Sequence, residues 1–204
     1  MEKIKIFDLS HFDIHKIFQE LKEIGATSFK LLRDDFRILL YNEALNFNYK
    51  KEPTEVNAKK YVVKMEVESF TNFPNNSLFY TLKETFQNFI INEFKKVGEE
   101  IFETPLNFNS MILLRYPKAS MGISPHQDNP KYINLICIFV IKDKGKFFIC
   151  KNEKGDDAIE ISSNEGNVII LRAPGFLKSK QQPFHFIKDI EEERYTFGLR
   201  QEKL

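Results

Sequence analysis

A chain of 204 residues is long enough to bury one sizeable core and too short for two comfortable domains, so we expect a single domain over residues 1–204. Hydrophobic residues make up 42% and charged residues 29%, a balance that excludes an intrinsically disordered chain. Thirty basic and 29 acidic side chains leave a formal net charge of +1, so there is no overall bias toward nucleic acid, although a local basic patch could still bind it.

The N-terminal half, residues 1–105, reads as helix-rich. Residues 10–25 place apolar side chains on one helical face, with Ser10 as a possible N-cap and Gly25 at the end. Residues 77–98 form a second amphipathic pattern with an aromatic stripe, which is typical of core packing rather than of a cofactor site.

Between these two helices the pattern changes. Residues 61–70 alternate as a strand does, and residues 41–60 are polar and irregular, so we expect a solvated loop there rather than a nucleic-acid contact. His11 and His15 lie near the start of the first helix, where we expect solvated or capping roles. The first residues, MEKIKIFDLS, lack the hydrophobic region of a secretory signal, and no apolar run reaches the roughly 18 residues of a membrane span. We therefore expect a cytoplasmic protein that does not contact a membrane.

The C-terminal half, residues 106–204, is predicted to be the β-barrel core. Short β-rich runs separated by turn residues favour a sandwich or jelly-roll barrel, against which the N-terminal helices pack in one α+β unit. The seven runs cover residues 109–116, 134–141, 146–152, 157–162, 167–173, 183–187 and 194–200. Cys137 and Cys150, the chain's two cysteines, lie in apolar runs at no zinc-binding spacing, so we expect buried free thiols.

Candidate metal ligands begin with His126 and Asp128 in the stretch GISPHQDNP. Alone, this pair is weak evidence, because a polar turn explains it equally well. On an extended segment, residues two apart point to the same side, so both side chains could reach one metal ion. His185, the remaining histidine of the β-rich half, could supply a third ligand. Two histidines and one carboxylate form the facial triad of non-heme Fe(II) oxygenases.

Arg194 and Arg200 follow on the last predicted strand. Their even separation places both on one face, and the planar guanidinium binds carboxylates bidentately, as a dicarboxylic co-substrate would require. Taken singly, His185 could be a hydrogen-bonded barrel histidine and Arg200 a solvated charge.

Together with Tyr116 in the run LRY, these residues resemble the AlkB-like branch of the Fe(II)/2-oxoglutarate-dependent dioxygenases over residues 107–202. The resemblance implies a double-stranded β-helix core in which His126, Asp128 and His185 hold Fe(II). It further implies that Tyr116, Arg194 and Arg200 hold 2-oxoglutarate, and that O2 is used to hydroxylate a substrate C–H bond.

The chain also departs from that pattern. Leu114 and Thr196 stand where AlkB-like proteins have asparagines that contact the co-substrate, and Pro130 replaces an acidic residue of the DNA-repairing members. Arg172 could point into a substrate pocket or pair with a surface carboxylate, and residues 177–183 could be a mobile loop at the mouth or a plain surface connection, which is commoner.

Three functions remain open at this stage. Near-neutral charge, Pro130 and the absence of tryptophan favour hydroxylation of a small molecule over a nucleic-acid substrate. The alternatives are oxidative demethylation of alkylated bases in DNA or RNA, which the HQD run and paired arginines would suit, and a non-catalytic sensor that binds 2-oxoglutarate.

Overall fold

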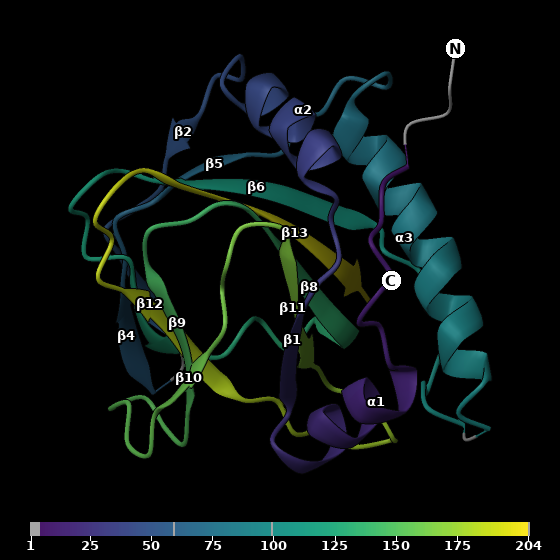
Figure 1. The fold of residues 1–204 in the computed structure, drawn as a ribbon. Helices are drawn as coiled ribbons and strands as arrows, with labels where there is room; N and C mark the ends of the chain where they lie inside the picture. The colour runs from purple at the N-terminus through teal and green to yellow at the C-terminus, as the bar shows by residue number, and fades with distance from the viewer. Residues whose placement is uncertain (1–4, 59, 99, 204) are drawn as a thin grey trace.

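Two β-sheets face each other, and helices cover the outer side of the larger one (Figure 1). The computed structural model describes residues 5–58, 60–98 and 100–203. The helices in these residues are α1 (Ile14–Glu23), α2 (Asp34–Ala44) and α3 (Leu78–Lys95). None of them is long and apolar enough to cross a membrane.

The larger sheet runs in the order β1-β11-β8-β13-β6-β5-β2, with antiparallel neighbours throughout. Its strands are β1 (Ala26–Lys30), β2 (Lys50–Lys51), β5 (Glu68–Phe70), β6 (Ser110–Tyr116), β8 (Tyr132–Lys142), β11 (Asn167–Arg172) and β13 (Arg194–Glu202). The smaller sheet, β10-β9-β12-β7, contains β7 (Ile123–His126), β9 (Lys146–Cys150), β10 (Ile159–Ile161) and β12 (Phe184–Lys188). A separate hairpin of β3 (Glu55–Ala58) and β4 (Tyr61–Lys64) lies beside β7, with a bridge between Met65 and Ile123.

Strand β13 shows how the larger sheet separates two environments. Tyr195, Phe197 and Leu199 are buried in the core beneath the helices. Thr196 and Gly198 alternate with them and face the space between the sheets. Strands β8 and β11 are buried on both faces, which is why their sequences are continuous apolar runs.

The aromatic stripe predicted for residues 77–98 is confirmed as core packing. Phe79 stacks obliquely on Phe197 with ring centroids 4.8 Å apart, and Phe86 meets Phe139 edge-on at 4.9 Å. These two helical aromatics therefore contact the outer face of the larger sheet, and phenylalanine side chains fill this interface.

The first helix begins later than predicted. Ser10 is not its N-cap; the Asp13 carboxylate instead accepts hydrogen bonds from the backbone N–H groups of His15 and Lys16. A carboxylate both satisfies free N–H groups and complements the positive end of the helix, so it caps this end.

We expect Asp13→Ala to lower the free energy of unfolding by about 1 kcal/mol, because two N–H groups lose their acceptor. Ser10→Ala is the matched control and should change it by less than about 0.5 kcal/mol. Chemical denaturation of both variants measures this difference, and equal effects would contradict the assignment of Asp13 as the cap.

The N-terminal half contains more strands than predicted. The expected strand over 61–70 is two strands in different sheets, β4 and β5, and the expected loop over 41–60 includes β2 and β3. Strand β1 and helix α2 were not predicted. Residues 26–30 form a strand because they pair with β11 in the larger sheet. Tertiary pairing outweighs local preference in such short segments.

Candidate active site

Three predicted metal ligands come together at the edge of the smaller sheet. His126 ends β7 and pairs in register with His185 on β12, and their ring centroids lie 4.3 Å apart. Asp128 follows two residues after His126, and its Oδ2 lies 3.4 Å from Nε2 of His185. The side chains of Asp128 and His185 are 10% and 6% exposed, so all interactions between them are shielded from bulk water.

Strand β7, which carries His126, was not among the predicted strands. Gly122 precedes it with a φ of +77°, and a side chain there would collide with the Ile187 carbonyl oxygen of β12. The glycine therefore permits both the left-handed turn and the close approach of the two strands. Nδ1 of His126 lies 2.9 Å from the Ser124 carbonyl oxygen, so Nδ1 carries the hydrogen and Nε2 keeps its lone pair.

Residues 177–183 contact the segment between the two ligands. Gln182 donates from its side chain to the Asp128 carbonyl oxygen at 2.8 Å, and Gln127 donates to the Gln182 carbonyl oxygen at 2.8 Å. The backbone N–H of Gln127 also donates to the Tyr61 hydroxyl at 3.2 Å. Residues 177–183 therefore contact the proposed ligand segment and are more than the plain surface connection that was predicted. The contacts of Tyr61 and Gln182 were not predicted, because their partners are distant in sequence.

Burial and charge keep the two histidines neutral and the aspartate ionised. Burial lowers the pKa of His126, and burial together with the neighbouring His126 lowers the pKa of His185 to about 3. Burial alone would raise the pKa of Asp128, but the Arg200 guanidinium and the two histidines outweigh it, so this pKa is below its usual value. Neutral imidazole and ionised carboxylate are the forms that bind metal ions.

The metal-free protein should lose stability as the pH falls below about 6.5. A histidine in the unfolded chain is protonated below this pH, whereas the pKa of folded His185 is about 3, so the unfolded state binds more protons and is favoured. The contribution of neutral His185 to the free energy of unfolding is fully present above pH 6.5, and we expect about 1–2 kcal/mol of it to be lost by pH 5. Denaturant titrations between pH 7 and pH 5 test this. His15→Ala, at an exposed histidine, should retain the loss, and a flat profile in the native sequence would contradict it.

A cavity of about 40 Å³ separates the two sheets at this point. Its wall on the smaller sheet includes His126 and His185, and its wall on the larger sheet includes Leu114, Tyr116, Thr196 and Arg200. Leu114 and Thr196, which replace the two asparagines of the family pattern, are partners in register across β6 and β13. These two departures from the AlkB-like pattern therefore fall side by side on one wall of this cavity.

The two predicted co-substrate arginines lie on the same face of β13, as their spacing requires. Arg200 Nη2 lies 3.3 Å from Asp128 Oδ1. Arg194 is fully buried, its guanidinium lies over the Tyr116 ring at 5.5 Å from the centroid, and its Nε bonds to the Asp143 carboxylate. Burial raises the pKa of Tyr116 to about 12, so its hydroxyl stays protonated and available as a donor.

Asp143 was not predicted, because its partner is 51 residues away and the turn KDKG resembles any exposed turn. Arg172, predicted to contact substrate or a surface carboxylate, pairs with no carboxylate among the residues that the structure describes, and its contact with substrate stays a prediction. It donates to the Leu21 and Lys22 carbonyl oxygens at 3.3 and 2.8 Å and to Gln181, so it caps the C-terminal end of α1.

The two cysteines are free thiols, as predicted. Cys137 is fully buried, and burial raises its pKa well above the usual value. Cys150 is only half-buried, so its predicted burial is wrong in degree, because its strand β9 alternates between the interior and solvent.

No group of three or more His, Cys, Asp or Glu side chains in the described residues is already arranged to hold a metal ion. One oxygen of the Asp128 carboxylate is paired with Arg200. The donor set still fits a divalent ion. The Oδ2 atom of Asp128 is buried without a hydrogen-bond partner in the described chain, and it lies beside a neutral imidazole nitrogen. A cation between them would satisfy both acceptors.

No family model and no curated protein matches the sequence. Solved structures do match. A prolyl-4-hydroxylase from Pseudomonas putida has 9% identity over 93% of this chain and 99% of that one, with a TM-score of 0.66. A prolyl hydroxylase from Trichoplax adhaerens, in complex with a hypoxia inducible factor peptide, has 10% identity over 93% and 89%, with a TM-score of 0.64. HygX from Streptomyces hygroscopicus, with nickel, 2-oxoglutarate and hygromycin B bound, has 8% identity over 92% and 86%, with a TM-score of 0.60.

At these identities the likeness establishes the fold. The predicted α+β class with a double-stranded β-helix core and supporting helices is confirmed. The AlkB-like branch stays a prediction.

Proposed function

We propose that this protein is a non-heme Fe(II)- and 2-oxoglutarate-dependent dioxygenase that hydroxylates a C–H bond of a small molecule. The observation that carries the proposal is the convergence of His126, Asp128 and His185 beside a cavity between the two sheets of this fold. The Asp128 Oδ2 atom is buried with no hydrogen-bond partner in the described chain, and such an atom is costly to bury, which favours a bound cation over chance proximity.

Each residue has a distinct part in the proposed site. His126, Asp128 and His185 would hold Fe(II), and bound iron would supply the redox chemistry that couples O2 and 2-oxoglutarate to hydroxylation. Tyr116, which lines the cavity, and Arg194, whose guanidinium lies over the Tyr116 ring, would hold the distal carboxylate of 2-oxoglutarate. Arg200 ties Asp128 to the larger sheet and places a positive charge beside the proposed metal position.

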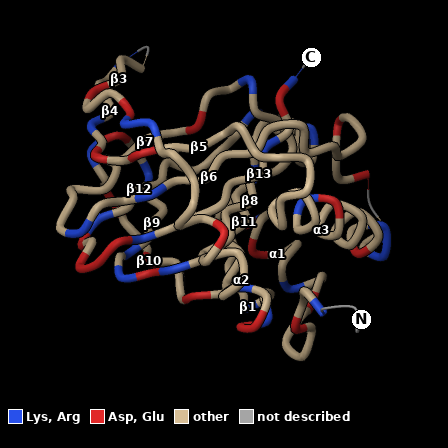
Figure 2. The backbone as a smooth tube through the Cα atoms, turned by 90° about the horizontal axis from the view of Figure 1, so that it is seen from above, with Lys and Arg blue, Asp and Glu red and all other residues tan. Residues whose placement is uncertain are grey.

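The substrate class is inferred from the distribution of charged residues. Figure 2 shows Lys and Arg residues interspersed with Asp and Glu along the loops around the smaller sheet, rather than gathered on one side. A nucleic-acid substrate would favour a continuous basic face. The solved structures of this fold include one with a peptide and one with hygromycin B bound, so the fold itself allows either a macromolecule or a small molecule.

The decisive experiment measures succinate formed from 2-oxoglutarate by protein supplied with Fe(II) and O2, with and without a panel of small molecules. Substrate-stimulated succinate supports the proposal. Binding of 2-oxoglutarate with no succinate across the panel would identify a sensor. Affinity for methylated oligonucleotides that falls steeply with salt would favour base demethylation instead.

A further inference from the structure

Arg194 already has a counter-ion. Its Nε bonds to Asp143 Oδ1, and the pair is almost completely buried, with side-chain exposures of 0% and 9%. The two terminal nitrogens, Nη1 and Nη2, are buried without an acceptor anywhere in the described chain. One edge of the guanidinium is therefore occupied, and the other edge lacks the acceptors that a buried arginine requires.

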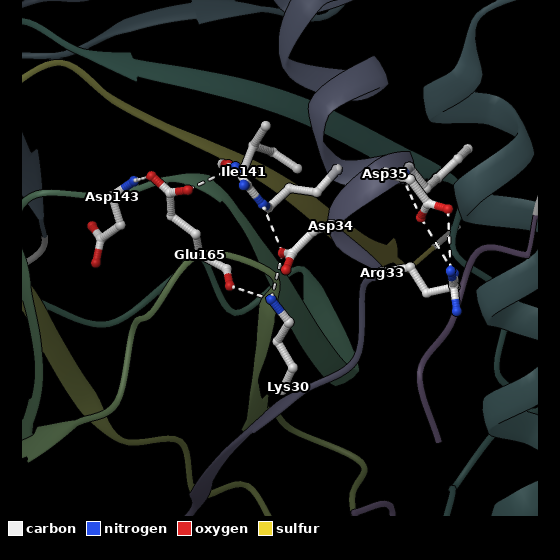
Figure 3. A network of polar contacts seen from close by, with 9 residues as sticks. Lys30, Arg33, Asp34, Asp35, Ile141, Asp143 and Glu165 are labelled. Atoms are coloured by element: carbon white, nitrogen blue, oxygen red, sulfur yellow. Dashed lines mark hydrogen bonds and ion pairs between the residues drawn. The ribbon is translucent and has the colours of Figure 1, made fainter. Parts of the chain in front are cut away.

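Asp143 is itself held in position from two sides. Its Oδ2 accepts a hydrogen bond from the Ser163 hydroxyl at 2.8 Å, and its backbone N–H donates to Glu165 at 3.4 Å. Glu165 in turn pairs with Arg37 of α2 at 2.7 Å. Figure 3 shows the contact between the Asp143 backbone N–H and Glu165, with the Asp143 carboxylate pointing away from Glu165. Asp143 is thus a fixed charge, not a side chain free to swing away when a ligand arrives.

We infer that Asp143 is the resident counter-ion of Arg194 and sets how tightly the site holds the distal carboxylate of its co-substrate. The inference rests on the proposed function, because it assigns the free edge of Arg194 to that carboxylate. A dicarboxylate would place a second negative charge on a guanidinium that Asp143 already neutralises. The two carboxylates repel each other at short range in a poorly screened interior, so Asp143 weakens the binding of a ligand with a distal charge and leaves an uncharged ligand unaffected.

Asp143→Asn tests this inference, since asparagine keeps the size and an acceptor oxygen while removing the charge. The probes are 2-oxoglutarate and 2-oxopentanoate, which differ in that the second has a methyl group in place of the distal carboxylate. Calorimetric titration of Fe(II)-loaded protein without oxygen measures both affinities. We expect Asp143→Asn to bind 2-oxoglutarate about 10- to 100-fold more tightly and 2-oxopentanoate unchanged within about threefold.

Glu165→Gln is the matched control. It removes one negative charge from the same network, but Glu165 contacts Arg37 and the backbone of Asp143 rather than Arg194. Both affinities should stay unchanged in this variant. If Asp143→Asn weakened 2-oxoglutarate, or altered both ligands equally, Asp143 would not act as a counter-ion and the inference would be overturned.

Stability gives a second readout. Without ligand, Asp143→Asn leaves the buried charge of Arg194 unpaired, so the melting temperature of the variant should fall by roughly 10 °C. Added 2-oxoglutarate should recover more of this loss in melting temperature than 2-oxopentanoate does. If the variant folds only with ligand, the same preference for the dicarboxylate is expected, and the double variant Asp143→Asn/Arg194→Gln should fold without either. Equal rescue by both ligands would overturn the inference. A native protein that binds neither ligand would instead overturn the proposed function, and this inference with it.

Discussion

Alanine in place of His126, Asp128 or His185 should reduce iron-dependent turnover by at least about two orders of magnitude while leaving a folded protein. His126 and His185 line the cavity, and Asp128 contacts His185. Each is proposed as a metal ligand, so its loss removes a donor that the remaining two cannot replace. Succinate formation measures turnover, metal content after dialysis measures iron retention, and circular dichroism confirms folding.

The controls for these substitutions are His11→Ala and His15→Ala, because both residues are exposed on the N-terminal segment, as predicted. They should retain full activity. Asp128→Ala also leaves Arg200 without its partner, so Asp128→Asn, which keeps the shape, separates loss of the ligand charge from loss of packing. Full activity in two of the three alanine variants would mean that the triad is assigned wrongly.

Arg194→Lys should weaken 2-oxoglutarate by roughly one to two orders of magnitude with little change in iron affinity. A buried charge-assisted hydrogen bond contributes about 1.5–3 kcal/mol, and lysine keeps the charge but loses the planar fork. The three lysine donors also radiate from one nitrogen, so they cannot offer Asp143 and a ligand carboxylate two separate edges as the arginine fork does. Anaerobic titration of Fe(II)-loaded protein with 2-oxoglutarate, followed by the charge-transfer band that its chelation of Fe(II) produces in 2-oxoglutarate-dependent dioxygenases, measures the change.

Arg200→Lys provides a contrast on the same strand. Arg200 pairs with Asp128, so this substitution should disturb iron binding as well as 2-oxoglutarate binding, whereas Arg194→Lys should not. Arg172→Lys, at an arginine that caps α1, should leave both affinities unchanged. Tight 2-oxoglutarate binding that neither Arg194→Lys nor Arg200→Lys disturbs would leave the iron site standing and refute the co-substrate assignment.

Local patterns in the sequence determined the parts of this protein that depend on periodicity. The aromatic stripe of α3 and the apolar runs of β8 and β11 were predicted from the spacing of apolar residues. A helix buried on one face repeats them every three to four residues, and a strand buried on both faces is a continuous apolar run. The even spacing of Arg194 and Arg200 likewise placed both on one face of β13, since a strand alternates every residue.

The tertiary structure alone decided how distant residues meet. Strand β7 is short and contains Pro125, so no strand pattern marks it in the sequence, and Gly122 lets it approach β12. The contact of Arg172 with the end of α1 could not be predicted from the sequence, because α1 is about 150 residues away along the chain. Arg194, which is proposed to bind the co-substrate, has its charge balanced by Asp143. No residue pattern around Asp143 in the sequence indicates this pairing. Periodicity reports which face a side chain occupies, but a partner across the barrel is fixed by strand order and register, and these arise only when the whole chain packs.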